Sequence, residues 1–239
     1  MRRDGRAHDA LRAVTITPDY LDFADGSVLC RFGQTVVLCA ATVQESVPPW
    51  MMGRGTGWVT GEYAMLPAST ETRTPRETRG LSGRTQEIRR LIGRSLRAAV
   101  DLSALGERSV IVDCDVIQAD GGTRTASVTG GYVALALALR RLVASGAVSA
   151  KVLAPPPVAA VSAGIVRGEV LLDLAYDEDS SAEVDLNVVM DGEGRFIEVQ
   201  GTAEGAPFTR EQLDELLRVS QEGIRQLIEV QRQAIAAAS

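Results

Sequence analysis

The residues best suited to chemistry lie between positions 113 and 126, which read Asp-Cys-Asp-Val-Ile-Gln-Ala-Asp-Gly-Gly-Thr-Arg-Thr-Ala. Alternating apolar residues predict a strand that stops at Gly121 and Gly122, and a helix that begins at once with Thr123 and Arg124. Free N–H groups of a first helical turn, the helix dipole and a guanidinium together favour a bound phosphate. An ordinary strand-to-helix turn with a solvated arginine explains the same residues, so this segment alone leaves both interpretations open.

The sequence offers little for nucleophilic catalysis. His8 is the only histidine, and it lies in a polar N-terminal segment, so a Ser-His-Asp or Cys-His arrangement has no support. No lysine follows the two glycines, which excludes a P-loop, and the turn is not Gly-x-Gly-x-x-Gly. The candidate catalytic groups that remain are arginines, backbone amides, and carboxylates with a metal. This set of groups favours phosphoryl transfer.

A second group of candidate residues is acidic. Asp179 ends an acidic turn, and Glu183, Asp185 and Asn187 alternate along the strand expected at 183–190. Alternation places these three side chains on one face of the strand. A few oxygen ligands of this kind suit Mg²⁺ better than zinc or a caged calcium. The alternative is a solvated edge strand after an acidic turn.

The basic residues are unusual in type and in distribution. Lys151 is the only lysine among 25 basic residues, and the formal net charge is −6. A GC-rich genome produces such an arginine bias, although arginine also pairs well with phosphate. Eight arginines fall within residues 73–97 and predict a local track for a polyanion: Arg73, Arg76, Arg79, Arg84, Arg89, Arg90, Arg94 and Arg97. Asp113 and Asp115, unfavourable in mid-strand, are expected to pair with arginines.

Length and composition predict a globular protein of 239 residues with an ordinary hydrophobic content of 45%. No apolar run approaches the roughly 20 residues that span a bilayer, and no secretory signal is recognised, so we expect no membrane partner. Cys30, Cys39 and Cys114 lie in apolar strand-like runs, which predicts buried reduced thiols and a cytoplasmic location.

Hydrophobic periodicity predicts one continuous α/β arrangement without a linker, in which each half ends in a long helix. Strands are expected at 12–18, 27–32, 35–43, 57–65, 109–118, 158–166, 169–176, 183–190 and 195–203. An arginine-rich loop at 71–83 precedes a helix, and longer helices are expected at 124–144 and 209–236. Thr209 and Gln212 form the capping box of the last helix, and small residues from Ala126 to Gly131 predict close packing.

Several motifs in a fixed order resemble the ribonuclease PH family of phosphorolytic exoribonucleases. They are Arg2-Arg3-Asp4-Gly5-Arg6, Gly-Trp-Val-Thr-Gly-Glu-Tyr-Ala-Met-Leu-Pro at 57–67, Gly-Arg-Thr-Gln-Glu-Ile at 83–88, the 113–125 segment, Glu178-Asp179 and Gln-Gly-Thr-Ala-Glu-Gly at 200–205. The resemblance implies a single domain over residues 1–239 with an α+β, sandwich-like fold of the ribosomal protein S5 domain 2 type. It also implies a homohexamer built as a trimer of dimers.

The activity implied by the resemblance is trimming of tRNA 3′ ends. The terminal nucleotide of a tRNA precursor is transferred reversibly to inorganic phosphate, and a nucleoside diphosphate is released. By position, the phosphate-binding residues are Arg84, Gly122, Thr123 and Arg124, and the catalytic and Mg²⁺-binding carboxylates are Asp179 and Asp185. Arg73 and Arg76 match a loop associated with hexamer contacts and RNA binding.

Two positions depart from the family pattern. Ser82 replaces a glycine, which alters loop freedom more than chemistry, and Ala68 replaces an arginine found in several relatives.

Two rival functions remain: a catalytically silent RNA-binding ring subunit, disfavoured by the intact arginines and carboxylates, and a hydrolytic nuclease, which would release monophosphates. Tyr63 and Trp58 are candidate base-stacking surfaces, although core packing explains Trp58 better.

Overall fold

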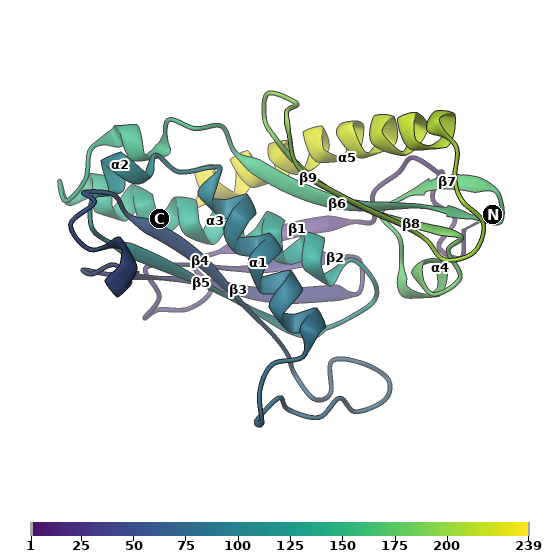
Figure 1. Ribbon diagram of the computed structural model, residues 1–239, viewed down its shortest axis with the longest axis horizontal. Helices are drawn as coiled ribbons and strands as arrows, with labels where there is room; N and C mark the ends of the chain where they lie inside the picture. Colours follow the sequence, from purple (N-terminus) through teal and green to yellow (C-terminus); the bar gives the residue numbers. More distant parts are fainter. Residues whose placement is uncertain (1, 239) are drawn as a thin grey trace.

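The computed structural model describes residues 2–238 and contains two β-sheets with a long helix between them (Figure 1). One sheet has the strand order β1-β2-β3-β5-β4, and the other has the order β7-β6-β8-β9. The strands are β1 (Val14–Pro18), β2 (Gly26–Phe32), β3 (Thr35–Gln44), β4 (Trp58–Met65), β5 (Ser109–Gln118), β6 (Val158–Val166), β7 (Glu169–Leu172), β8 (Val184–Asp191) and β9 (Phe196–Ala203). The α-helices are α1 (Gly83–Arg97), α2 (Leu102–Leu105), α3 (Thr123–Ala144), α4 (Tyr176–Asp179) and α5 (Arg210–Ala237), and short 3₁₀ turns cover Pro49–Met51 and Ala150–Leu153. This is the mixed α/β class that the sequence predicts.

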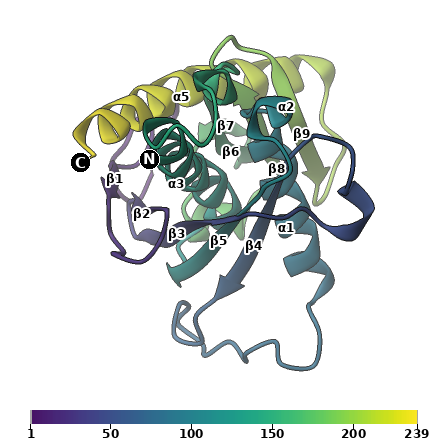
Figure 2. The ribbon, with the colours of Figure 1, turned by 90° about the vertical axis from the view of Figure 1, so that its left-hand side faces the viewer.

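Helix α3 forms the centre of the core, because it packs against strands of both sheets (Figure 2). A Cβ atom on Gly130 would lie 2.7 Å from the Cβ atom of Cys30 and 3.0 Å from the sulfur of Cys39. The close packing expected for the small residues of this helix is therefore confirmed. All three cysteines are buried free thiols, as predicted. By length and composition α3 could cross a membrane, but 72% of its apolar window is buried inside the protein.

The first sheet carries the elements that lead to the candidate phosphate site. Strands β4 and β5 run parallel, and α1 lies between them in the chain and packs on β4. Ile88, Leu91 and Ile92 are buried on the inner face of α1, as its apolar spacing predicts. Residues 66–82 form a loop between β4 and α1 that projects from the body of the molecule (Figures 1 and 2).

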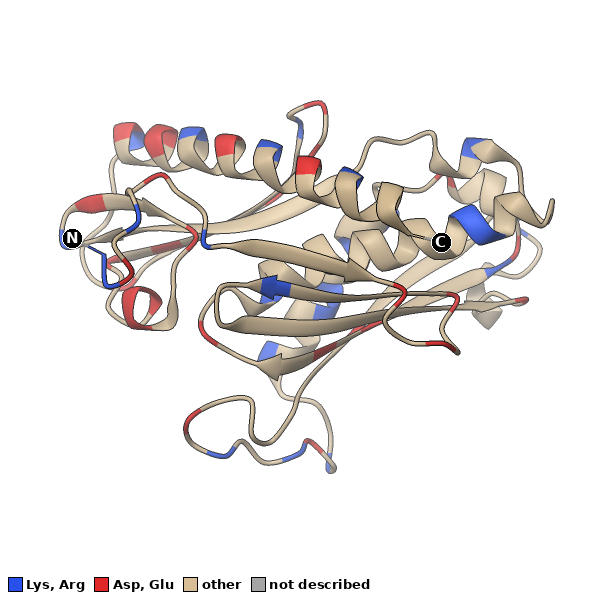
Figure 3. Ribbon diagram, turned by 180° about the vertical axis from the view of Figure 1, so that it is seen from behind, with Lys and Arg blue, Asp and Glu red and all other residues tan. Residues whose placement is uncertain are grey.

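The second sheet is antiparallel throughout and is covered by α5. The predicted capping box at the start of α5 is present: the Gln212 N–H donates to the Thr209 hydroxyl at 3.2 Å, and the Thr209 N–H donates to the Gln212 amide oxygen at 2.7 Å. The outward face of α5 carries alternating acidic and basic residues (Figure 3), as expected for a solvated helix surface.

The strand predicted at 169–176 is wrong in its second half. Strand β7 ends at Leu172, Asp173 takes a left-handed backbone conformation with φ of 55°, and α4 begins at Tyr176. The cause is a contact distant in sequence. The buried Asp173 carboxylate accepts a hydrogen bond from the Arg12 backbone N–H at 2.8 Å and from the Arg12 guanidinium at 2.7 and 3.0 Å. Local periodicity carries no signal for such a turn.

Buried arginines of the N-terminal segment fix this turn to the rest of the protein. Arg2 donates two hydrogen bonds of 2.7 Å to the Glu178 carboxylate and one of 2.8 Å to the Leu172 carbonyl. Arg12, besides holding Asp173, donates to the carbonyl of Asp120 at 2.5 Å. The N-terminal segment therefore connects β7 and α4 with the loop that precedes α3.

We expect Asp173→Asn to cost about 3–5 kcal/mol of unfolding free energy, because it leaves the buried Arg12 guanidinium with only the more distant Asp120 carboxylate, at 4.0 Å, as a counter-charge. Asparagine tolerates the left-handed backbone as aspartate does, so the substitution isolates the loss of charge. Urea unfolding at pH 7 measures the effect. Glu215→Gln, in an exposed pair with Arg218, is the control and should change stability by less than about 1 kcal/mol. Equal midpoints for the two variants would contradict the role of the buried pair.

Candidate active site

A pocket of about 520 Å³ opens where the N-termini of α1 and α3 meet α4 and β8. It brings together six of the residues predicted from the sequence, although they come from four separate elements of both halves of the chain. The lining includes Arg84, Gly122, Thr123, Arg124, Asp179 and Asp185, together with Met65, Thr70, Glu71, Thr72, Ala119, Asp120, Gly121, Ser162, Tyr176 and Asn187.

The loop before α3 needs glycine at both of its last positions. Gly121 and Gly122 have φ angles of 73° and 66°. A Cβ atom on Gly121 would lie 2.6 Å from the carbonyl oxygen of Leu174, so this glycine allows the chain before α4 to approach the loop. The Thr35 hydroxyl donates to the Gly121 carbonyl at 2.7 Å and accepts from the Asp120 N–H at 2.9 Å. These contacts fix the loop on its inner side, beside the first turn of α3, whose N–H groups have no intrahelical acceptors.

Thr123 and Arg124 occupy the first two positions of α3, as predicted. The Thr123 hydroxyl hydrogen-bonds the Tyr63 hydroxyl at 2.9 Å. The Arg124 guanidinium donates to the Gln200 amide oxygen at 2.7 Å and lies 3.3 Å from the Glu87 carboxylate. Arg124 is therefore oriented by residues of α1 and β9. Sequence reasoning did not assign Glu87 or Gln200 a role, although both lie within family motifs.

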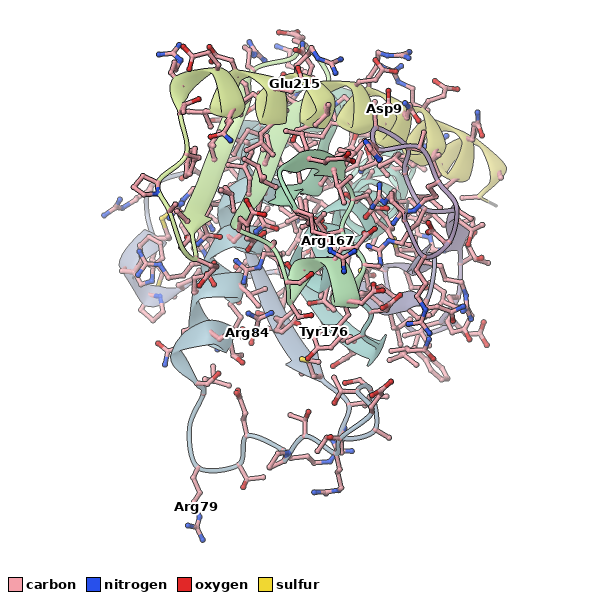
Figure 4. All side chains as sticks on the ribbon, turned by 90° about the vertical axis from the view of Figure 1, so that its right-hand side faces the viewer. Asp9, Arg79, Arg84, Arg167, Tyr176 and Glu215 are labelled. Atoms are coloured by element: carbon pink, nitrogen blue, oxygen red, sulfur yellow. The ribbon has the colours of Figure 1, made fainter. Side chains whose placement is uncertain are left out.

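Arg84 reaches the same pocket from the first turn of α1 (Figure 4). Ser82 caps this helix, since its hydroxyl accepts from the Thr85 N–H at 3.2 Å. The departure from glycine at position 82 therefore supplies a helix cap. Within residues 2–238 no carboxylate forms an ion pair with Arg84, so its guanidinium is available to an anion.

The two predicted carboxylates lie together on the side of the pocket formed by the second sheet. Burial raises the pKa of Asp179, against the charges of Arg84 and Arg124. Burial, reinforced by the negative charge of Asp179, raises the pKa of Asp185 to about 6. The Asn187 amide donates to both Asp185 oxygens at 3.3 Å. This carboxylate pair has the electrostatic environment of a functional site.

Glu183 does not join this pair. It precedes β8, is exposed, and its carboxylate accepts a hydrogen bond from the Gly168 N–H at 3.0 Å. Val184, Leu186 and Val188 face the core as the alternation predicts. The prediction that Asp185 and Asn187 share one face of the strand is therefore confirmed. The prediction that Glu183 belongs with them is wrong.

The arginines of the cluster at residues 73–97 differ in their partners. On α1, Arg89 and Arg94 form ion pairs with Glu62 and Glu198, and Arg97 lies 4.3 Å from the ring centre of Trp58. These arginines have local structural partners. Arg73 and Arg76 are exposed in the projecting loop, do not line the pocket, and have no ion-pair partner in the described part of the chain. Arg84 in the pocket and the exposed Arg79 and Arg90 also have no ion-pair partner among residues 2–238, so the arginines that are free for a polyanion lie in the loop, in the pocket and on α1.

Two further expectations are not met. Asp113 and Asp115 form no ion pair with arginine among residues 2–238, and burial raises the pKa of both carboxyl groups. Tyr63 is only 4% exposed and cannot offer its ring to a base. Trp58 packs against Arg97 and, edge to face, against Trp50 at 4.8 Å between ring centres. The aromatic residue that lines the pocket is Tyr176, which sequence reasoning missed.

Two helix N-termini bearing arginines, opposite two carboxylates, define a class of enzyme that acts on phosphate groups. Comparison with known proteins gives the family. Residues 10–140 match the description "3′ exoribonuclease family, domain 1", and residues 156–223 match "3′ exoribonuclease family, domain 2". The chain belongs to this family. Together with its identity of 56–58% to the curated relatives described next, this makes it a phosphate-dependent 3′-to-5′ exoribonuclease, with inorganic phosphate as co-substrate.

Curated relatives and solved structures agree with this assignment. A protein of Moorella thermoacetica named ribonuclease PH is 58% identical, over 98% of this chain and 94% of its own length. A protein of Bdellovibrio bacteriovorus with the same name is 56% identical, over 95% and 93%. The Archaeoglobus fulgidus exosome with RNA bound to the active site has a chain that is 26% identical, with a TM-score of 0.77 over 95% of this chain and 91% of its own. Rice Rrp46, 18% identical with a TM-score of 0.78 over 98% of this chain and 100% of its own, shares the fold.

In the metal-free protein, we expect Asp179→Asn to lower the pKa of Asp185 from about 6, because it removes a neighbouring negative charge. The pKa should stay above 3.8, since burial remains. The Asp185 carboxyl group is a weaker acid in the folded protein than in the unfolded chain. Its stabilising contribution to the unfolding free energy is therefore lost as pH rises from about 4 to about 6. That loss should become smaller in the variant. Carboxyl ¹³C NMR measures the pKa directly.

The control for this titration is Asp191→Asn, at the far end of the same strand, where Asp191 pairs with Arg195 at 2.7 Å. It should leave the Asp185 titration unchanged. An Asp185 pKa that is the same with and without Asp179 would contradict the coupling of the two carboxylates.

Proposed function

We propose that inorganic phosphate binds between the first turns of α3 and α1. The amides of Thr123 and Arg124 contact it on one side and the Arg84 guanidinium on the other, while the glycines allow close approach. The observation that carries this proposal is that Arg84 and Arg124 open two helices whose N-termini face one pocket. Positive charge from two guanidinium groups and two helix dipoles is thereby concentrated where a small anion fits.

We propose that Asp179 and Asp185 hold Mg²⁺. Mg²⁺ is commonly bound by one or two carboxylates, with substrate phosphate oxygens and water completing the octahedron. The residues present fit this pattern, because two carboxylates with raised pKa lie together on the pocket wall beside the Asn187 amide. When bound, the ion would neutralise charge on the scissile phosphodiester of the RNA.

In the proposed reaction, an oxygen of inorganic phosphate attacks the phosphorus of the last phosphodiester. A new P–O bond forms, the bond from phosphorus to the 3′ oxygen of the shortened RNA breaks, and a nucleoside diphosphate leaves. The departing 3′ oxygen takes up a proton. The pKa of about 6 for Asp185 describes the metal-free protein, and bound Mg²⁺ would lower it, so we propose that a pocket carboxylate relays this proton from solvent. Arg84 and Arg124 hold the attacking group in position.

We further propose that the substrates are tRNA precursors and other RNA 3′ ends, processed in the cytoplasm by a homohexamer built as a trimer of dimers. Support comes from similarity to ribonuclease PH over nearly the whole chain and to chains of exosome cores. The exposed arginines of the projecting loop provide a surface for RNA or for a neighbouring copy, and a ring would present several such loops to one RNA.

The phosphate site is tested by Arg124→Ala. We expect the protein to fold and its KM for phosphate to rise at least tenfold, because a hydrogen bond to a charged group contributes about 1.5–3 kcal/mol. The assay follows nucleoside diphosphate release from an RNA with extra 3′ nucleotides, at varied phosphate. Arg225→Ala on the exposed face of α5 removes the same charge and should change nothing. Normal turnover by Arg124→Ala at limiting phosphate would reject the assignment, and monophosphate products would show hydrolysis.

The loop is tested by replacing Arg73 and Arg76 with alanine. We expect a weaker hexamer and slower cutting of tRNA precursors, with less effect on a very short RNA that needs only the pocket. The salt dependence of tRNA binding should become shallower, because fewer counterions are released. Light scattering and binding at several salt concentrations measure these changes. The paired control replaces Arg218 and Arg225 on α5. An unchanged hexamer with equal losses on long and short RNA would place these arginines in catalysis instead.

A further inference from the structure

Tyr176 is the one aromatic side chain among the described residues that line the pocket, and 63% of it is exposed. Figure 4 shows it at the opening that Arg84 also faces. Other aromatic residues, such as Phe23 and Trp50, are also exposed, but none of them lines this pocket. We propose that Tyr176 is a stacking platform for the base of the terminal RNA nucleotide. This inference rests on the phosphate and carboxylate roles proposed above.

The backbone of Tyr176 is fixed while its ring is left free. Its N–H donates to the Asp120 carboxylate at 3.3 Å, and a Cβ atom on Gly121 would lie 2.9 Å from its nitrogen. The neighbouring Ala175 N–H donates to Glu178 at 3.0 Å, and Glu178 is held by Arg2. The ring therefore projects from a backbone that is tied directly to the anion-binding loop.

Helical spacing places the ring over the reaction site. Tyr176 and Asp179 are three residues apart in α4, so their side chains leave the same face of the helix. Both line the pocket. With the scissile phosphate at the Asp179 and Asp185 carboxylates, a ring one helical turn away is placed to cover the base of the nucleotide being removed.

The exposed ring of Tyr176 is suited to stacking, which does not depend on which base is bound. The Asn187 amide, which could recognise a base, is used by Asp185. A tyrosine ring accepts any base, because every base presents a π-face. Successive removal of different nucleotides requires this kind of tolerant binding. Tyr176 is thus a binding residue for RNA, with no role in holding inorganic phosphate.

The test uses RNA with a fluorescent 2-aminopurine at the 3′ end and an otherwise identical RNA that lacks the terminal base. We expect Tyr176→Ala to raise the KM for RNA between about fivefold and a hundredfold and to abolish quenching of the 2-aminopurine. The KM for phosphate should not change. Tyr176→Phe should retain both functions, since it keeps the ring. On the base-less RNA, the wild-type protein and Tyr176→Ala should perform equally.

The matched control is Tyr20→Ala, because Tyr20 is 49% exposed but lies in the loop between β1 and β2, outside the pocket. An equal loss on base-less RNA, or a smaller assembly by light scattering, would overturn the stacking role and make Tyr176 a structural or interface residue. Arg124→Ala is measured in parallel. If that variant keeps its phosphate KM, the proposed phosphate site fails, whatever the result for Tyr176.

Discussion

The pocket depends on the buried contact between Arg12 and Asp173. This pair joins the N-terminal segment, the turn after β7 and the loop before α3, which lie far apart in the sequence. Removing two charges from water is costly, and the cost is offset only if the remaining hydrogen-bonding positions are filled. Here the backbone supplies them: the Arg12 N–H donates to Asp173, and the Asp120 carbonyl accepts from Arg12. These directional hydrogen bonds fix the relative positions of the three segments more closely than apolar packing alone would.

The consequence is a site shared between two sheets. Its arginines begin helices that are associated with the first sheet, and its carboxylates come from α4 and β8 at the second. The pocket arginines and the pocket carboxylates therefore come from different parts of the fold. Glu87 and Gln200 hold the Arg124 guanidinium on the α1 side, where it lowers the pKa of Asp179 and Asp185 without an ion pair to either. The burial-raised pKa of these carboxyl groups can persist because no arginine neutralises them directly.

Periodicity and turn chemistry predict most of the elements, because they depend on neighbours in sequence. Strands β5 and β6 agree with prediction at both ends, and the glycine turn leads directly into α3. The failures arise from distant contacts. Asp173 leaves the strand conformation because Arg12 binds it. The burial of Tyr63, by contrast, follows the alternation of β4, in which Val59 and Gly61 are buried on the same face. The pocket role of Tyr176 also needed the fold, since α4 is too short for a periodic pattern.

The charge layout explains why phosphate can replace water as the attacking group in the proposed reaction. Attack by one phosphate on another brings two anions together, so each needs its own countercharge. The helix N-termini with Arg84 and Arg124 would serve the incoming phosphate, and the carboxylate pair with Mg²⁺ would serve the phosphodiester. Because the arginines and the carboxylates come from different elements of one pocket, the two anions would be held at separate positions, as an in-line attack requires. A single cluster of positive charge would attract both anions to the same place and would not set the direction from which one attacks the other.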